Sequence, residues 1–418
     1  MSTKHTEIVS KFTVKRDADS WISGFLLLGV LVGLPGSLLI AWQYHLEADP
    51  KLIGLHFLSL NAGYVIAVAC AQPLLLRISM RTVALLSCLI AAGSLGGLSL
   101  AAPPVWAIWR VVGLGFVGFA GGLLAACLLY ALEPHFKRSA AASTNLAGLW
   151  FGCGCLYSTF IVGASYFAGS VHKETALLGV VPLVFLFVFA LSRSSIARGP
   201  VQVCQEENQL RDTLRDLRSI AAVLFSVLLF FQFGNEWAIA GWLPLFLIHR
   251  LGTNPVWAIA TLAVYFLALI VGRLASQWLL RRISHRKLLL ASTFVAMAGY
   301  LLLSLTASMA IAVTAVVIIG AAFAPIYPLI AETLDDRFSY HPGFYNGLFS
   351  VAMTGAMMAP WLLGYVDDYL GMQYVMLVPA IGSVIVLVIA LLIMLEAHVM
   401  GGKSGDQLQQ RAAVASGN

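Results

Sequence analysis

Long apolar runs separated by short polar connections fill almost the whole chain. A helix needs about 20 predominantly apolar residues to cross the hydrocarbon core of a bilayer. Twelve runs meet this length, at residues 20–44, 52–76, 81–101, 104–131, 140–168, 174–193, 219–248, 255–281, 286–306, 308–332, 342–366 and 372–396. The pattern therefore predicts an all-α membrane protein with twelve transmembrane helices.

The composition supports a lipid environment. Hydrophobic residues make up 60% of the chain and charged residues only 11%, whereas a soluble domain carries about 25% charged residues. The net charge of +6 does not indicate a nucleic-acid partner, because the basic residues are distributed over separate connections. We expect the lipid bilayer to be the main partner, and the protein to be a monomer.

The basic residues also predict the orientation. If both termini are cytoplasmic, 20 of the 25 Lys and Arg residues lie on the cytoplasmic side and three on the outer side, as expected for short cytoplasmic loops. The polar segment 1–19 runs into the first apolar run without a small-residue cleavage site, so we expect a retained first span. The expected location is the plasma membrane, which in a bacterium is the inner membrane.

The spans divide into two sets of six. Residues 194–218 form the longest polar stretch, with the charge alternation of a short surface helix. Residues 76–100 align without gaps on residues 281–305, and the shared Arg-Ile-Ser-x-Arg falls after span two and after span eight. Repeated halves are typical of secondary transporters, with the site between them. The predicted parts are a tail at 1–19, a bundle at 20–193, a linker at 194–218, a bundle at 219–396 and a tail at 397–418.

Glu236 is the first candidate functional residue. It lies near the middle of the span 219–248. A carboxylate in hydrocarbon is costly, so such residues usually face a bundle interior or a water-filled cavity and mark a transport pathway. The functional interpretation is a carboxyl that binds and releases a proton during transport. The structural alternative is a protonated or arginine-paired acid that holds two helices together.

Two arginines lie inside predicted spans. Arg110 is about six residues from the outer end of span four. It could bind a hydroxylated or anionic solute through its planar set of donors, or extend its charge to the outer headgroups. Arg273 lies deeper, in span eight, where we expect a gating or packing ion pair. Whether either arginine contacts solute is left open by the sequence.

Amide side chains near Glu236 and at equivalent depths could bind hydroxyl groups. Gln232 and Asn235 share its span, Asn145 opens span five, and Asn346 begins a polar stripe in span eleven. Amides offer both donors and acceptors, which suits sugar hydroxyls. The structural alternative is hydrogen bonding between helices, worth about 0.6 kcal/mol each in a membrane.

Three aromatic residues could stack on a sugar ring: Trp242, Tyr265 and Tyr327. Trp242 could instead anchor the outer interface. Pro325 and Pro328 bracket Tyr327 and predict a kink in span ten, because proline removes a backbone donor.

Other motifs point away from an enzyme. Residues 113–118 match the dinucleotide-binding glycine pattern but lie inside a span with no preceding strand. Cys153 and Cys155 have no second pair or histidine nearby, so we expect no metal site. We predict no catalytic residues and no cofactor other than an ion gradient, of protons or, alternatively, of sodium.

The loop at residues 277–287 resembles the Gly-x-x-x-Asp-Arg-x-Gly-Arg-Arg loop of the major facilitator superfamily, with Gln277 and Ser284 in place of the glycines and Arg281 in place of the aspartate. The second half is similar to the fucose/sugar–proton symporter branch in residues 234–244, Gly272-Arg273 and residues 324–328. This resemblance implies two pseudo-symmetric six-helix bundles, with spans one, four, seven and ten lining the path. The first half lacks the acids that symporters of this branch carry within spans one and four.

These features predict a secondary transporter that moves a small polar organic solute, sugar-like or polyol-like, by alternating access with proton coupling. Two alternatives within transport are efflux of amphipathic compounds by antiport and uncoupled facilitated diffusion. A third, from another class, is a membrane receptor or scaffold that transports nothing. The tail and the central linker are short for a signalling domain.

Overall fold

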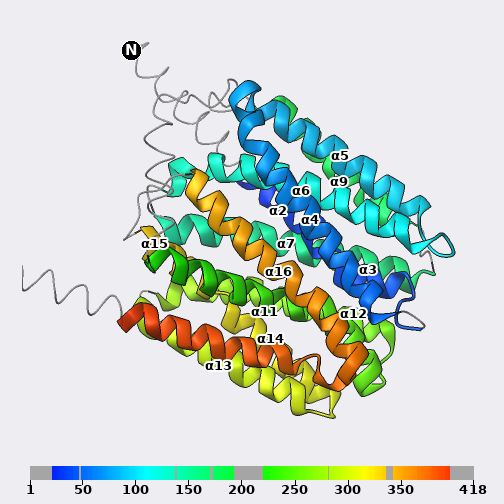
Figure 1. Cartoon of the computed structure of the whole chain (residues 1–418), viewed down its shortest axis with the longest axis vertical. Helices are drawn as coiled ribbons and strands as arrows, with labels where there is room; N and C mark the ends of the chain where they lie inside the picture. Colours follow the sequence, from blue (N-terminus) through cyan, green and yellow to red (C-terminus); the bar gives the residue numbers. More distant parts are fainter. Residues whose placement is uncertain are drawn as a thin grey trace, which may run out of the picture.

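The structure is a computed structural model that describes residues 21–46, 49–136, 139–169, 173–192, 220–280, 282–335 and 342–395. The predicted linker at 194–218 and the tails at 1–19 and 397–418 lie outside the described residues. The described chain is helical from one end to the other (Figure 1). Its helices are α2 (Gly24–Gly33), α3 (Pro35–Ala41), α4 (Pro50–Arg77), α5 (Met80–Leu100), α6 (Ala107–Phe136), α7 (Ala140–Phe167), α8 (Glu174–Leu178), α9 (Val180–Leu191), α11 (Ile220–Leu251), α12 (Pro255–Leu279), α13 (His285–Leu305), α14 (Met309–Phe323), α15 (Ile326–Asp335) and α16 (Pro342–Leu370), followed by the short 3₁₀ helix η1 (Met372–Tyr374).

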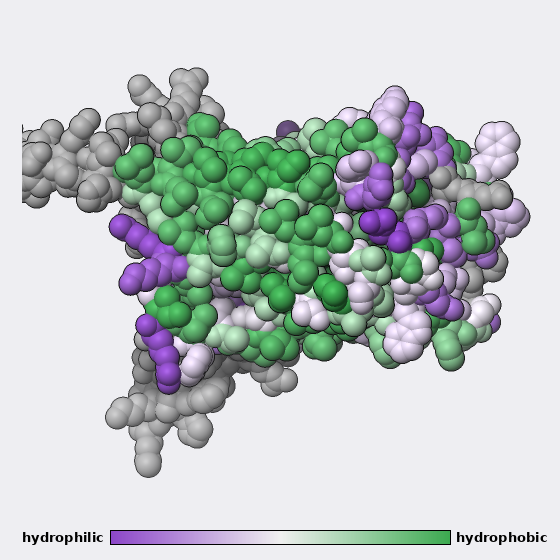
Figure 2. Space-filling view, turned by 90° about the horizontal axis from the view of Figure 1, so that it is seen from below, coloured by the Kyte–Doolittle hydropathy of each residue, from purple (hydrophilic) through white to green (hydrophobic). Residues whose placement is uncertain are grey.

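The predicted number of spans is confirmed. In the described residues, eleven helices are long and apolar enough to cross a membrane, and the bent pair α2–α3 makes a twelfth. The last span, Met372–Leu395, follows η1, and α8 and α9 together form the sixth. The outer surface agrees with this assignment, because a broad hydrophobic band separates the polar residues at the two ends of the molecule (Figure 2).

The first span is broken, which was not predicted from the sequence. Helices α2 and α3 meet at an angle of 46° around Leu34 and Pro35. Proline has no N–H to donate to the carbonyl four residues earlier, and its ring clashes with that carbonyl. The helical ladder is therefore interrupted at Pro35, although Leu34 keeps helical backbone angles.

The tenth span is interrupted next to its prolines. Helix α14 ends at Phe323 and α15 begins at Ile326, so the interruption falls on Ala324 and Pro325. Ala324 keeps helical backbone angles, and Met309–Leu334 forms one span, so the kink predicted in span ten stays a prediction.

The two sets of six spans pack as separate bundles (Figure 1). In the first bundle α4 packs against α6 and α2 against α7, and in the second α11 packs against α16 and α12 against α14. The main contacts that join the bundles are those of α4 with α16, of α7 with α12 and α15, and of α3 with α11. Any site between the halves must lie beside these contacts.

We name the two ends of the molecule after Lys51 and Arg77, which lie at the two ends of α4. The Lys51 end holds residues 42–46, 101–106 and 252–254, and the Arg77 end holds residues 78–79 and 282–284. The positive-inside pattern predicts that the Arg77 end is cytoplasmic.

Glycines bring the halves together at the Lys51 end. A Cβ added to Gly36 of α3 would collide with the backbone carbonyl of Ala240 on α11. A Cβ at Gly54 of α4 would lie 2.7 Å from the backbone oxygen of Trp361 on α16. The backbones of the two halves therefore touch directly here, and the Lys51 end is closed in this structure.

A surface ion pair spans the same closure. Lys51 of α4 and Asp368 of α16 lie 2.7 Å apart, with about a third of each side chain exposed. The ammonium also lies 4.8 Å from the centre of the Tyr369 ring. Exposed pairs of this kind contribute little to stability, so the close glycine contacts give this end its shape and the ion pair favours the closed state only slightly.

Candidate functional site

Glu236 lies half-way along α11, sixteen residues after Ile220 and fifteen before Leu251. Its side chain is partly accessible, whereas the flanking Asn235 and Trp237 are buried. Groups from both halves interact with it electrostatically, including Arg273 of α12 and Cys155 of α7. Glu236 therefore faces the boundary between the halves.

Arg273 reaches across that boundary. It lies on α12 in the second half, with 6% of its surface exposed. Its guanidinium donates a hydrogen bond from Nη1 to the backbone carbonyl of Gly148 on α7, in the first half. In return, the amide of Asn145 on α7 donates to the backbone oxygen of Arg273 at 3.1 Å. Two of the predicted site residues, Arg273 and Asn145, are thus brought together.

Gly148 is required for this contact. A Cβ at Gly148 would lie 2.5 Å from Nη1 and 2.7 Å from Cζ of Arg273. An added Cβ would therefore displace the guanidinium from the position that it occupies in this structure. In the sequence, Gly148 stands out only as half of a glycine pair four residues apart, and the arginine that fills its space comes from a distant span.

Glu236 and Arg273 interact without forming a direct ion pair. Each affects the charge of the other, yet the side-chain hydrogen bond of Arg273 goes to the first half and its Nε has no protein partner. The expected pairing of Arg273 with an acid is therefore not made in this conformation.

Tyrosine hydroxyls hold the backbone around Glu236. Tyr265 of α12 donates to the backbone oxygen of Glu236 at 3.3 Å, and Tyr300 of α13 donates to the backbone oxygen of Asn235. The Asn235 amide lies 3.5 Å from the hydroxyl of Ser383. Tyr265 and Asn235 are thus engaged within the second half, and Tyr300 was not predicted from the sequence.

Gln232 lies one turn before Glu236 on α11. It is 1% exposed, and its side-chain nitrogen has no protein partner. A buried donor without a partner is rare in folded proteins. This amide is therefore available to a solute that reaches it.

Aromatic rings from three helices of the second half meet beside Glu236. Phe233 lies 5.4 Å from Tyr327 and 5.8 Å from Phe349, measured between ring centres. Tyr64 of α4 reaches Phe349 from the first half at 6.5 Å. Tyr327 and Phe349 are partly accessible, so their rings combine packing with an open surface, and Tyr327 stays a candidate for stacking.

Trp242 and Asn346 complete the predicted site residues. Trp242 is fully buried and donates its indole N–H to the backbone oxygen of Pro360 at 2.8 Å. It therefore joins α11 to α16 and does not lie at a lipid interface in this structure. The side chain of Asn346 lies outside the described residues.

Arg110 lies in a closed network at the Lys51 end. It is 5% exposed and donates to the hydroxyl of Tyr44 at 2.9 Å and to the backbone oxygens of Ala101 and Val105 at 3.0 and 2.8 Å. Tyr44 in turn lies 3.2 Å from Nε2 of His56. The guanidinium is thus bonded inside the first half, and it does not extend to the headgroups.

The tautomer of His56 follows from this network. Its Nδ1 lies 2.7 Å from the backbone oxygen of Leu52, which can only accept, so Nδ1 carries a proton. In the neutral ring Nε2 accepts from Tyr44, and the Tyr44 oxygen accepts from Arg110. Along the series of hydrogen bonds from Arg110 through Tyr44 and His56 to the Leu52 carbonyl, each donor then meets an acceptor.

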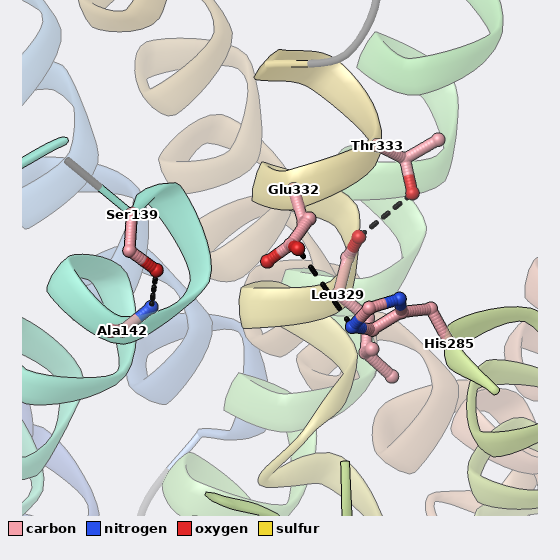
Figure 3. Close-up of polar contacts among 6 residues, drawn as sticks. All are labelled: Ser139, Ala142, His285, Leu329, Glu332 and Thr333. Atoms are coloured by element: carbon pink, nitrogen blue, oxygen red, sulfur yellow. Dashed lines mark hydrogen bonds and ion pairs between the residues drawn. The ribbon is translucent and has the colours of Figure 1, made fainter. Parts of the chain in front are cut away.

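The Arg77 end carries its own polar contacts (Figure 3). His285 at the start of α13 lies 3.8 Å from the carboxylate of Glu332 on α15. Ser139 caps α7 by accepting from the backbone N–H of Ala142 at 3.3 Å. These contacts are local to each half, in contrast to the bond between Arg273 and Gly148.

One buried acid was not predicted from the sequence. Glu174 opens α8 at the Lys51 end with 1% of its surface exposed, and neither carboxyl oxygen has a protein partner. It lies at the start of a predicted span, where an acid is expected to be solvated. Among the described residues, no three His, Cys, Asp or Glu side chains gather as a metal site requires.

Two helical halves of six spans each, with buried charged groups where they meet, are the architecture of a membrane transporter. The sequence profile of the Major Facilitator Superfamily matches residues 20–356, and the chain belongs to this family.

Solved structures agree on the fold. A variant of the nucleoside transporter NupG is similar with a TM-score of 0.70 and 14% identity, over 90% of this chain and 99% of that one. FucP, a Major Facilitator Superfamily transporter in the outward conformation, is similar with a TM-score of 0.65 and 18% identity, over 90% and 98%. A variant of FucP described as the E. coli fucose:proton symporter gives the same values. No curated protein sequence matches the chain.

Proposed function

We propose that this transporter moves a small hydroxylated organic solute, a sugar or a polyol-like compound, together with a proton. The observation that carries the proposal is the position of Glu236: a partly accessible carboxyl half-way along α11, facing the other half of the molecule. Ionisable groups at this depth usually serve transport pathways.

The groups around Glu236 suit a hydroxylated ring. Gln232 offers an unbonded donor, and the accessible rings of Tyr327 and Phe349 offer apolar faces. Amides bind hydroxyl groups, and aromatic faces pack on the apolar side of a ring. Two similar solved structures are described as a fucose:proton symporter and as a nucleoside transporter, whose solutes share a hydroxylated sugar ring.

A nucleoside is the second candidate solute. The observation that favours it is the aromatic group of Phe233, Tyr327 and Phe349, with ring centres 5.4–6.4 Å apart. A planar base would stack on such rings more favourably than a sugar alone. The same rings suit the amphipathic compounds of the efflux alternative, so the test must include all three classes.

Uptake into proteoliposomes separates these possibilities. The full-length protein is reconstituted and given labelled pentoses, hexoses, polyols and nucleosides, with a pH gradient, a sodium gradient or neither. Proton coupling predicts accumulation only with the pH gradient. A single proton driven by 100 mV releases about 2.3 kcal/mol, which supports roughly 50-fold accumulation.

Glu236→Gln tests the role of the carboxyl. We expect this variant to lose accumulation but to keep exchange of solute between the two sides, because the amide cannot release a proton. Glu236→Asp is the matched control and should retain part of the accumulation. Accumulation by Glu236→Gln equal to that of the unmodified protein would remove the proton role. Dependence on sodium alone would identify the other ion, and outward movement of amphipathic dyes without uptake of any sugar would favour efflux.

A further inference from the structure

Arg273 connects the two halves through a neutral acceptor. The second half supplies the charge and the first half supplies the backbone carbonyl of Gly148. Asn145 adds a second bond across the same contact, from its amide to the backbone of Arg273. We use the name α7 seat for Asn145 and Gly148 together.

The α7 seat is specific in shape but incomplete in hydrogen bonding. Gly148 leaves space that a Cβ would fill, so the guanidinium fits closely. Yet Nε of Arg273 and Oδ1 of Asn145 have no protein partner, although both residues are more than nine-tenths buried. Buried groups left unbonded weaken a contact. The seat therefore holds Arg273 less strongly than a fully bonded site would.

Glu236 is the competing partner for the same guanidinium. It belongs to the same half as Arg273 and interacts with it electrostatically. A carboxylate attracts the guanidinium through its opposite charge and can accept from two of its donors at once, whereas the Gly148 carbonyl is neutral and accepts one hydrogen bond from it. An ionised Glu236 would therefore attract Arg273 away from a neutral carbonyl, and a protonated Glu236 would not.

The other titratable groups around this pair are tyrosines and cysteines. Those that interact with Arg273 or Glu236 come from α7, α12, α13 and α15. Tyrosine and cysteine side chains in water are largely uncharged at neutral pH and below. Among the described groups around Arg273, Glu236 is thus the one that changes charge on mild acidification. The surrounding tyrosines and cysteines are Cys153, Cys155, Tyr265, Tyr300 and Tyr327.

We propose that Arg273 alternates between the α7 seat and Glu236, so that a proton on Glu236 joins α7 to α12 and loss of that proton separates them. The proposal rests on the proton coupling proposed above and names the residues through which coupling acts. Asn145 and Gly148 are positioning residues in this scheme, because neither needs to touch solute or proton. The structure shows the joined state.

The direct test measures the distance between α7 and α12. Nitroxide amino acids are introduced at Ala142 and Gln277, two exposed positions near the Arg77 end of these helices, so the native cysteines stay unchanged. The distance between the two nitroxides is then measured by pulsed electron paramagnetic resonance on full-length protein in lipid nanodiscs, at pH 5.5 and pH 8. We expect the short-distance population of the unmodified protein to increase at least threefold at the lower pH.

Three variants give separate expected results. Glu236→Gln should keep the short-distance population high at both pH values, because it imitates the protonated acid. Gly148→Ala should reduce that population at least tenfold at both pH values. Gly93→Ala on α5 is the matched control, since no heavy atom lies within 4 Å of its added Cβ, and it should behave like the unmodified protein.

Each contrary result has a defined meaning. If the short-distance population is unchanged in Gly148→Ala, Gly148 does not hold Arg273 on α7, and the α7 seat is contradicted. If Gly148→Ala does not fold, as judged by gel filtration, Asn145→Ala replaces it and should reduce the same population. If the distance between α7 and α12 does not change with pH although uptake is driven by protons, the alternation of Arg273 is contradicted but the proposed function stands. If the distance between α7 and α12 changes with pH but uptake is not driven by protons, the alternation of Arg273 stands and the proposed function is contradicted.

Discussion

The surroundings of the two buried arginines differ more than their sequence contexts suggest. Arg110 makes three hydrogen bonds, all within the first half, and lies near the faces of Trp42 and Tyr44, with its carbon Cζ 5.7 and 5.3 Å from the ring centres. Arg273 makes its side-chain bond to the other half and leaves Nε without a protein partner. A charge whose hydrogen bonds all lie inside one bundle stabilises that bundle, whereas a charge bonded between bundles, with one donor left without a partner, can change partners.

Substitution of Arg110 should have the largest effect on stability. Arg110→Leu removes donors from Tyr44 and from two backbone oxygens, and hydrogen bonds to charged groups are worth about 1.5–3 kcal/mol each. We expect the free energy of unfolding in detergent to fall by at least about 1.5 kcal/mol, measured by chemical denaturation. Arg110→Lys should recover part of this loss. Normal stability with abolished transport would instead indicate that Arg110 contacts solute.

Substitution of Arg273 should affect transport more than stability. Arg273→Lys keeps the charge but loses the planar set of donors, and the two side chains are not interchangeable at such sites. We expect the uptake rate to fall about tenfold, equivalent to about 1.4 kcal/mol, with the unfolding free energy nearly unchanged. The comparison of the two arginines fails if Arg273→Lys destabilises the protein as much as Arg110→Leu does.

The exposed pair at the Lys51 end should have a smaller effect. Lys51→Asp places two acids together, and we expect it to lower the closed population of that end by up to roughly fivefold. The exchanged pair, Lys51→Asp with Asp368→Lys, should restore closure. The solvent accessibility of a probe placed at Leu46 measures the loss of closure in the single variant and its recovery in the exchanged pair. High salt should reduce the difference, and a salt-independent effect would point to packing.

The smallest expected effect is a pH dependence at the same end. Burial and the nearby His249 imidazole lower the pKa of His45. The unfolded chain therefore binds this proton more readily than the folded protein, so stability from the neutral ring is complete above about pH 6.5 and decreases as the pH falls. His45→Gln should flatten the change in melting temperature between pH 7.5 and 5.5, and His249→Gln should flatten it less. Equal slopes in all three proteins would contradict this assignment.

Much of the fold could be predicted because it depends on local sequence. The apolar runs gave twelve spans, and Pro325 gave the interruption in span ten. The break at Pro35 was missed even though the cause is the same, because the run around it is uniformly apolar and no polar residue marked the site. Local pattern therefore predicts the number of spans better than their straightness.

The candidate site was less predictable, because its contacts join distant spans. Arg273 and Gly148 are 125 residues apart, and no periodicity relates them. The two interpretations of Arg110 omitted its actual partners, the backbone oxygens of the 101–106 connection, since backbone acceptors leave no trace in side-chain patterns. Glu174 was overlooked because its burial comes from packing between helices.

The break at Pro35 has a mechanical consequence. Helix α2 packs on α7 of its own half, while α3, only seven residues long, packs on α11 of the other half. The 46° break directs this short segment out of the line of α2, so that Gly36 meets the backbone of Ala240 on α11. One span is thereby shared between two bodies: its longer part belongs to one, and its shorter part forms the seam with the other.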